Sequence, residues 1–185
     1  MENFSTSGLM SVEEYLELER DSEVRHEYVN GVLYAMTGAG RRHNSIANNI
    51  SSLLWIAARG DPCRVHQSDM KVLTPDGPFY YPDVMVACGD EPEDEYFEDA
   101  PCLLVEVVSP KTESKDRLEK LAAYRKIPTL GAYLIVDQKQ RRIERHFRDE
   151  NGKWNRTELT DGEGCLPAPC PPGAELSLAD IYEGL

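Results

Sequence analysis

The stretch Cys102-Leu-Leu-Val-Glu-Val-Val108 decides the fold, because it predicts a buried strand with one carboxylate inside it. Short apolar runs rich in valine and leucine are typical of strands that are buried on both faces. A carboxylate there costs considerable free energy unless it is paired or bound to a metal. Glu106 is therefore the first candidate for a functional residue. An ordinary ion pair with a neighbouring Arg or Lys is the alternative.

A second strand, predicted at 80–88, brings another acid to the same place. The loop from Gly89 to Ala100 joins it to the strand of Glu106. In an antiparallel pair folded about the centre of this loop, Asp83 lies directly opposite Glu106 on one face. Two facing carboxylates repel each other, and a bound divalent cation would remove that conflict. Mg²⁺ suits such a site, although Pro82-Asp83 is also an ordinary way to begin a strand.

The rest of the chain predicts an N-terminal helix and a β-hairpin, followed by strands and helices in mixed order. Ser11 and Glu14 have the spacing of a capping box, and Asn30-Gly31 is a strong hairpin signal. We expect helices at 11–20, 43–58 and 113–126, and strands at 24–29, 32–36, 65–73, 80–88, 102–108, 132–136, 141–148 and 153–159. This order predicts an α/β (α+β) fold in which helices flank a mixed β-sheet, within one domain spanning residues 1–185.

The charge of the chain argues against a protein that binds nucleic acid by bulk electrostatics. Its net charge is −13, from 33 acidic and 20 basic residues. Seven of the acidic residues lie between Asp90 and Asp99, however, and the basic residues cluster elsewhere. A local basic face within an acidic protein is therefore compatible with the sequence.

The hydropathy of the chain indicates where the protein is located, and its cysteine content indicates whether disulfides or metal sites are expected. No apolar run reaches the roughly 18 residues of a membrane helix, and the N-terminus does not resemble a secretory signal. We therefore expect a cytoplasmic protein with no membrane partner. Among the five cysteines, Cys63, Cys88 and Cys102 are expected to be small buried hydrophobes. We expect no metal site at Cys165 and Cys170, because neither a His nor a third Cys lies near them in the sequence.

Four segments together carry a more specific signal than any of them alone. They are Tyr81-Pro-Asp-Val-Met-Val86, Leu104-Val-Glu-Val-Val-Ser-Pro-Lys-Thr112, the spacing Asp116-xxx-Lys120-xxx-Tyr124, and Ala132-Tyr-Leu-Ile-Val-Asp137. With Tyr15, Glu27-Tyr-Val-Asn-Gly31 and His43, they resemble the Uma family of restriction endonucleases, in the PD-(D/E)XK nuclease superfamily. The resemblance reaches to about residue 148. It implies the restriction-endonuclease-like fold and the hydrolysis of phosphodiester bonds, with DNA as the expected substrate and Mg²⁺ or Mn²⁺ as the cofactor.

The same resemblance implies roles for individual residues. Asp83 and Glu106 would bind the metal together with the backbone carbonyl of Val107. The superfamily's usual lysine lies two residues after the second acid, where this chain has Val108. Lys120 shares a helix face with Asp116 and Tyr124, and some superfamily members carry the catalytic lysine on this helix. We expect Lys120 to hold the attacking water, although a surface ion pair with Asp116 is the alternative.

Further residues are weaker candidates. The family pattern places an acid at Glu27, which would bind the metal or orient water. His43 could contact phosphate or be purely structural, and Lys71 is a second substitute for the lysine missing at position 108. Ser109 and Thr112 are expected mainly to shape the turn and cap the following helix.

Three functions stay open on the sequence alone. The first is a metal-dependent endodeoxyribonuclease. The second is a catalytically silent protein of the same fold that binds a partner or nucleic acid, which Val108 and the net charge favour. The third is a metal-dependent hydrolase with another substrate. A homodimer is compatible with the first function, because cutting both strands of a duplex commonly needs two sites, but no residue specifies it.

Overall fold

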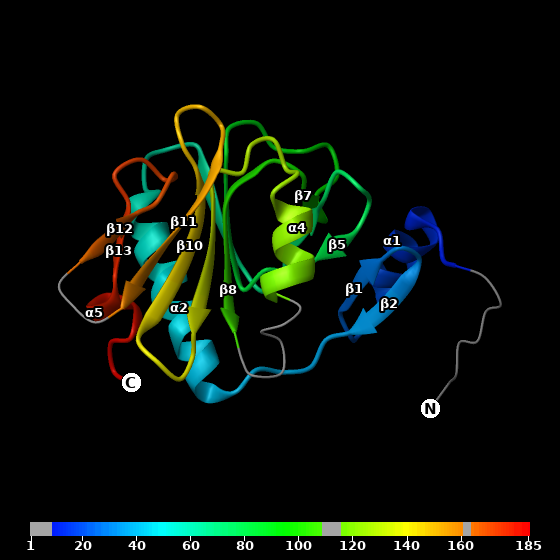
Figure 1. Cartoon of the computed structure of the whole chain (residues 1–185). Helices are drawn as coiled ribbons and strands as arrows, with labels where there is room; N and C mark the ends of the chain where they lie inside the picture. The colour runs from blue at the N-terminus through cyan, green and yellow to red at the C-terminus, as the bar shows by residue number, and fades with distance from the viewer. Residues whose placement is uncertain (1–8, 109–115, 161–163) are drawn as a thin grey trace.

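The computed structural model describes residues 9–108, 116–160 and 164–185 (Figure 1). Its larger sheet contains, in spatial order, β11 (Trp154–Thr160), β10 (Arg142–Arg148), β9 (Ala132–Asp137), β8 (Pro101–Val108), β6 (Val84–Cys88) and β3 (Cys63–Gln67). The pair β8 and β9 is parallel and the other neighbours are antiparallel, so this sheet is mixed, as predicted.

A second sheet incorporates the predicted N-terminal hairpin. Its spatial order is β2 (Val32–Ala35), β1 (His26–Val29), β5 (Phe79–Tyr80), β4 (Lys71–Leu73) and β7 (Phe97–Glu98). The turn between β1 and β2 is at Asn30-Gly31, where both residues have positive φ, as that turn requires. The preceding helix α1 (Val12–Asp21) begins with the predicted capping box of Ser11 and Glu14.

The other helices cover opposite faces of the six-stranded sheet. Helix α2 (Arg41–Ala57) packs on one face, and a π-helical turn η1 (Asp116–Lys120) that continues into α4 (Leu121–Tyr124) packs on the other (Figure 1). A short hairpin of β12 (Cys165–Pro167) and β13 (Glu175–Ser177) and helix α5 (Leu178–Ile181) complete the α2 side. None of the helices in the described segments is long and apolar enough to cross a membrane.

Alternate residues of β8 belong to two separate apolar clusters, one on each face of the sheet. Leu103, Val105 and Val107 face α2, whereas Leu104 and Val108 face α4. Glu106 is two residues from both Leu104 and Val108, so its side chain projects to the same α4 side of the sheet, where the η1 turn can reach it. The same alternation explains why β8 reads as a continuous apolar run: both of its faces are covered.

Two of the predicted strands are wrong in their extent. The strand expected at 65–73 is divided between β3 and β4, which belong to different sheets, because the chain turns at Ser68 with a φ of 61°. The strand expected at 80–88 is divided between β5 and β6 at Pro82, which has no N–H to contribute to a ladder. The helix expected at 113–126 is described only from Asp116, and Ser109 and Thr112 lie outside the described residues.

The prediction for the cysteines is also wrong. Cys63 is bonded to Cys88, and Cys102 is bonded to Cys170. Cys63 and Cys88 are cross-strand partners in the register of β3 and β6, so their side chains share one face. Cys102 and Cys170 are 68 residues apart in the sequence, and the sequence carries no local pattern that would have paired them. Cys165 is free and exposed.

Candidate active site

Asp83 lies immediately before β6, where the register places it opposite Glu106. Val84 pairs with Val105 and Met85 with Leu104, so the predicted strand pairing is confirmed beside the site, although the register shifts between Val86 and Ala87, nearer the loop. The Val107 N–H donates to Asp83 Oδ2 at 2.7 Å. This bond fixes the Asp83 carboxylate against β8, on the stretch of strand that carries Glu106.

Glu106 is 4% exposed and is enclosed by polar partners from η1 and α4. The Lys120 ammonium lies 2.8 Å from Glu106 Oε1, and the Tyr124 hydroxyl donates to the same oxygen at 3.1 Å. Lys120 and Tyr124 are one helical turn apart and reach the same atom, as their spacing predicts. An opposite charge and a hydroxyl donor offset the cost of burying the carboxylate.

Lys120 joins the N-terminal hairpin to the central sheet. Its ammonium lies 2.9 Å from Glu27 Oε1 as well as 2.8 Å from Glu106 Oε1, and the residue is 5% exposed. The prediction that Lys120 points toward the carboxylates and away from solvent is confirmed. Glu27 itself is 7% exposed, so the three charges form one buried acid–base–acid group.

His43 approaches the site from the other side of the sheet. It belongs to the first turn of α2, and its Nε2 lies 3.2 Å from Asp83 Oδ2. Gly40 caps this helix without a side-chain hydrogen bond, and its first turn contains no acidic residue. The positive end of the α2 dipole therefore faces the region of Asp83.

These residues line one cleft of about 520 Å³. The segment between β2 and α2, from Met36 to Gly40, forms part of its wall, together with the start of α2. Residues from seven parts of the fold meet there: Arg25, Glu27, His43, Ser68, Asp83, Glu106, Val107, Lys120 and Gln138. A site assembled from such distant segments is open to a ligand yet held by both sheets.

Arg25, Tyr81 and Gln138 were missed as cleft residues. A signal for Arg25 existed, because it is two residues before Glu27 and so shares a face of the hairpin strand. Its guanidinium donates to the Ser68 carbonyl at 2.8 Å and also contacts Asp69. Gln138 follows β9 directly, and only the parallel pairing of β8 with β9 brings it beside the cleft.

Other candidates lie elsewhere. Lys71 is 6% exposed and is not among the residues that line the cleft. Its ammonium lies 5.5 Å from the centre of the ring of Tyr81, which does line the cleft. Burial lowers the pKa of Lys71. Val108 packs in the apolar cluster beside Tyr124, where a lysine would have no room among apolar neighbours. Lys120 is thus the lysine that the fold brings to Glu106.

The donors fit a hard divalent cation. Asp83 and Glu106 supply carboxylate oxygens, and the peptide of Val107 is oriented toward Asp83. In an extended strand the N–H and C=O of one residue point to the same side. The Val107 N–H bonds Asp83, whereas the carbonyl of Val108 accepts from Gln138 on the opposite side. The Val107 carbonyl therefore faces Asp83, and oxygen donors of this kind suit Mg²⁺ or Mn²⁺.

The chain is similar in sequence to two known proteins and in structure to a third. An uncharacterized protein of Synechocystis sp., slr1290, is 36% identical over 149 residues, which cover 78% of this chain and 77% of the relative. A second one, sll1609, is 30% identical over 160 residues, 84% of this chain and 90% of the relative. A crystal structure from Anabaena variabilis, described as "a putative nuclease belonging to DUF820", matches with a TM-score of 0.74. Its sequence identity is 17%, and the match covers 94% of this chain and 97% of that one.

The structural match confirms the predicted restriction-endonuclease-like fold. The family model described as "Uma2: Putative restriction endonuclease" matches residues 12–179, which include Glu27, Asp83, Glu106 and Lys120. The resemblance expected from the sequence motifs is therefore confirmed, and the chain belongs to the Uma2 family.

Proposed function

We propose that this protein is a metal-dependent nuclease that hydrolyses phosphodiester bonds in DNA. The convergence of Asp83, Glu106 and Lys120 in one cleft carries the proposal, because two acids and a lysine are the groups this hydrolysis needs. Asp83, Glu106 and the Val107 carbonyl would hold Mg²⁺ or Mn²⁺. When bound there, such an ion supplies a Lewis acid for the phosphate and lowers the pKa of a water ligand.

The side chains of the cleft would perform the remaining tasks. The Lys120 ammonium lies beside Glu106, where it can hold the attacking water and offset negative charge on the phosphate. Glu27, on the other side of this ammonium, can accept a hydrogen bond from the same water. Tyr124 keeps Glu106 in place through its hydroxyl. These groups are positioned in advance by the two sheets, which reduces the reorganisation needed for catalysis.

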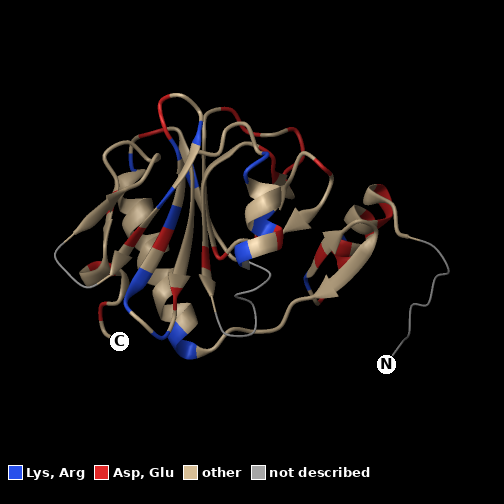
Figure 2. Ribbon diagram, viewed as in Figure 1, with Lys and Arg blue, Asp and Glu red and all other residues tan. Residues whose placement is uncertain are grey.

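A phosphate would be attracted mainly by the start of α2 and by Arg25. Backbone N–H groups at a helix N-terminus bind phosphate, and Gly40, His43 and Asn44 all line the cleft. Figure 2 shows blue basic residues at this end of α2, at the bottom of the view, whereas many red acidic residues lie in the loops at the top. Part of the acidic charge that would repel DNA therefore lies away from the start of α2.

The proposal includes a cellular location, an oligomeric state and a domain organisation. A cytoplasmic protein would meet DNA directly, and a homodimer would allow both strands of a duplex to be cut. One nuclease domain over residues 1–185 would suffice for each active site.

The test of the proposal compares wild type with Glu106→Ala on supercoiled plasmid, at low salt, with Mg²⁺, Mn²⁺ or EDTA. We expect slow nicking by wild type that requires the metal and is absent in Glu106→Ala. Equal nicking by both proteins would assign the activity to a contaminant. If wild type cleaves neither duplex DNA, single strands nor RNA with any metal, the silent binding function replaces this one.

A further inference from the structure

Four of the five cysteines gather at one end of the six-stranded sheet. Cys63 begins β3 and Cys88 ends β6, so they are neighbours across the sheet. Cys102 is the second residue of β8, and Cys170 lies between β12 and β13. Asp83 precedes β6 and Glu106 is near the end of β8, so the cysteines lie roughly 15 Å away along the strands, at the opposite end.

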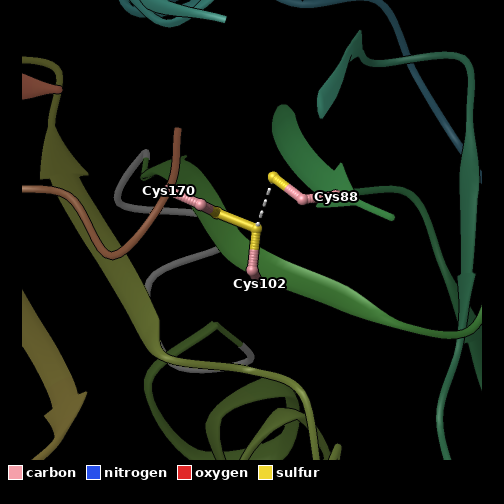
Figure 3. Close-up of side chains that lie close together, drawn as sticks. All are labelled: Cys88, Cys102 and Cys170. Carbon is pink, nitrogen blue, oxygen red and sulfur yellow. Dashed lines mark hydrogen bonds between the residues drawn. A yellow bond between two sulfur atoms is a disulfide. The ribbon is translucent and has the colours of Figure 1, made fainter. Parts of the chain in front are cut away.

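Three of these sulfur atoms form a compact group. The sulfurs of Cys88, Cys102 and Cys170 all lie within 4.8 Å of one another, and those of Cys88 and Cys102 are 3.6 Å apart (Figure 3). Zinc–thiolate bonds of about 2.3 Å in a tetrahedron separate the sulfurs by about 3.8 Å. The spacing of two separately bonded cysteines thus already matches the edge of a zinc–thiolate site.

We propose that, when its disulfides are reduced, the protein binds a thiophilic cation such as Zn²⁺ through Cys88, Cys102 and Cys170, with Cys63 as the fourth ligand. A dithiol reductant would open each protein disulfide. The reductant is oxidised to a disulfide, and the protein disulfide is reduced to two thiols. Each thiol that then binds the metal releases one proton. Cys63 lies outside the compact group, but its sulfur is bonded to that of Cys88 in the oxidised chain, so a change of its side-chain rotamer after reduction would bring it to the metal.

The composition of this site distinguishes it from the carboxylate cleft. Sulfur ligands select Zn²⁺ or Cu⁺, whereas carboxylates and carbonyls select Mg²⁺ or Mn²⁺. Cys170 is 6% exposed and belongs to the apolar cluster under α2 and α5, and the half-buried Cys88 and Cys102 pack against the same cluster. The inference does not depend on the proposed nuclease activity.

The site would fasten the C-terminal segment to the central sheet in either redox state. Cys170 lies in the connection between β12 and β13, and Leu166, Leu176 and Ile181 of this segment are part of the α2-side core. In the oxidised chain the Cys102–Cys170 bond makes this attachment. In a reducing compartment disulfides do not persist, and a metal would replace the lost attachment.

Cobalt binding tests this proposal, because Co²⁺ bound by thiolates has a sulfur-to-metal absorption band that carboxylate ligands do not give. The protein is reduced with a dithiol, freed of it under anaerobic conditions and titrated with Co²⁺. We expect one Co²⁺ per chain with the thiolate band, displaced by Zn²⁺. Cys102→Ser should lose the band. Cys165→Ser is the matched control and should keep it, as should Asp83→Ala/Glu106→Ala.

A second measurement uses only wild type, in case Cys102→Ser does not fold. The reduced protein is alkylated with and without Zn²⁺, and the modified cysteines are located by mass spectrometry. We expect Zn²⁺ to slow alkylation of Cys63, Cys88, Cys102 and Cys170 at least tenfold and to leave Cys165 unchanged. No thiolate band with reduced wild type, the same band with folded Cys102→Ser, or equal alkylation with and without Zn²⁺ would overturn the proposal.

Discussion

Replacing Lys120 by Met should destabilise the protein strongly, because it removes the cation shared by Glu27 and Glu106. The ammonium lies 2.9 and 2.8 Å from these carboxylates, and its side chain is 7% exposed. At an effective dielectric constant of about 20, each contact contributes about 6 kcal/mol of attraction, most of it offset by desolvation. Loss of one partner from a buried ion pair costs about 3–5 kcal/mol.

Urea unfolding followed by circular dichroism measures this loss. Lys120→Met should lower the free energy of unfolding by about 3–5 kcal/mol, and adding Glu27→Gln should restore part of it because one of the two uncompensated charges disappears. Lys126→Met is the matched control: its side chain is 54% exposed and its partner Asp76 is 56% exposed. A surface pair of this kind contributes about 0–1 kcal/mol.

The outcome that refutes this reasoning is specific. If Lys120→Met costs no more than Lys126→Met, the three buried charges do not act as one group. If Glu27→Gln makes Lys120→Met less stable still, Glu27 is not an uncompensated charge in that variant. Either result would also remove the argument that Lys120 is held in place for catalysis.

Three further predictions concern acid stability, the hairpin and salt. Burial raises the pKa of Glu98, but hydrogen bonds from His66 and Arg64 outweigh it and hold the pKa at about 2. Because the folded pKa is below the usual value, this carboxylate stabilises the fold above about pH 4.5, and roughly 3 kcal/mol is lost as the pH falls to about 2. Urea unfolding of Glu98→Gln should show a correspondingly flatter pH profile, and an unchanged profile would contradict this. Gly31→Ala should lower the thermal midpoint more than Gly60→Ala. Both have positive φ, but only at Gly31 would a Cβ lie 2.5 Å from Leu9 Cβ, and equal losses would argue against that contact. DNA affinity, measured by fluorescence anisotropy, should fall roughly 40-fold between about 50 and 200 mM salt if three phosphates are contacted, and a flat profile would exclude such contacts.

Most of the site could be predicted from local regularities of the sequence. Counting residues from the loop between β6 and β8 predicts the pairing of Val84 to Val86 with Leu103 to Val105, and so the opposition of Asp83 and Glu106, although it does not predict the register shift between Val86 and Ala87. Helical spacing places Lys120 and Tyr124 on one face, and the apolar run around Glu106 requires that they reach inward. These inferences succeed because each depends on one element or on one pair of adjacent strands.

The features that escaped prediction depend on contacts between distant segments. The Cys102–Cys170 bond forms because the C-terminal hairpin folds back over β8, and no pattern near either cysteine specifies that path. Gln138 reaches the cleft through a parallel strand pair. The breaks at Ser68 and Pro82 turn two expected strands into four because the chain moves there from one sheet to the other.

The central claim is that Asp83 and Glu106 bind a divalent cation, and isothermal titration with Mn²⁺ tests it most directly. The oxidised protein is used, so that the four clustered cysteines are bonded and do not compete as ligands. We expect one Mn²⁺ per chain for wild type and for the control Asp69→Ala/Asp76→Ala, which removes two acids outside the cleft lining. Asp83→Ala/Glu106→Ala should bind none. Binding of Mn²⁺ by this double variant with wild-type affinity would contradict the account.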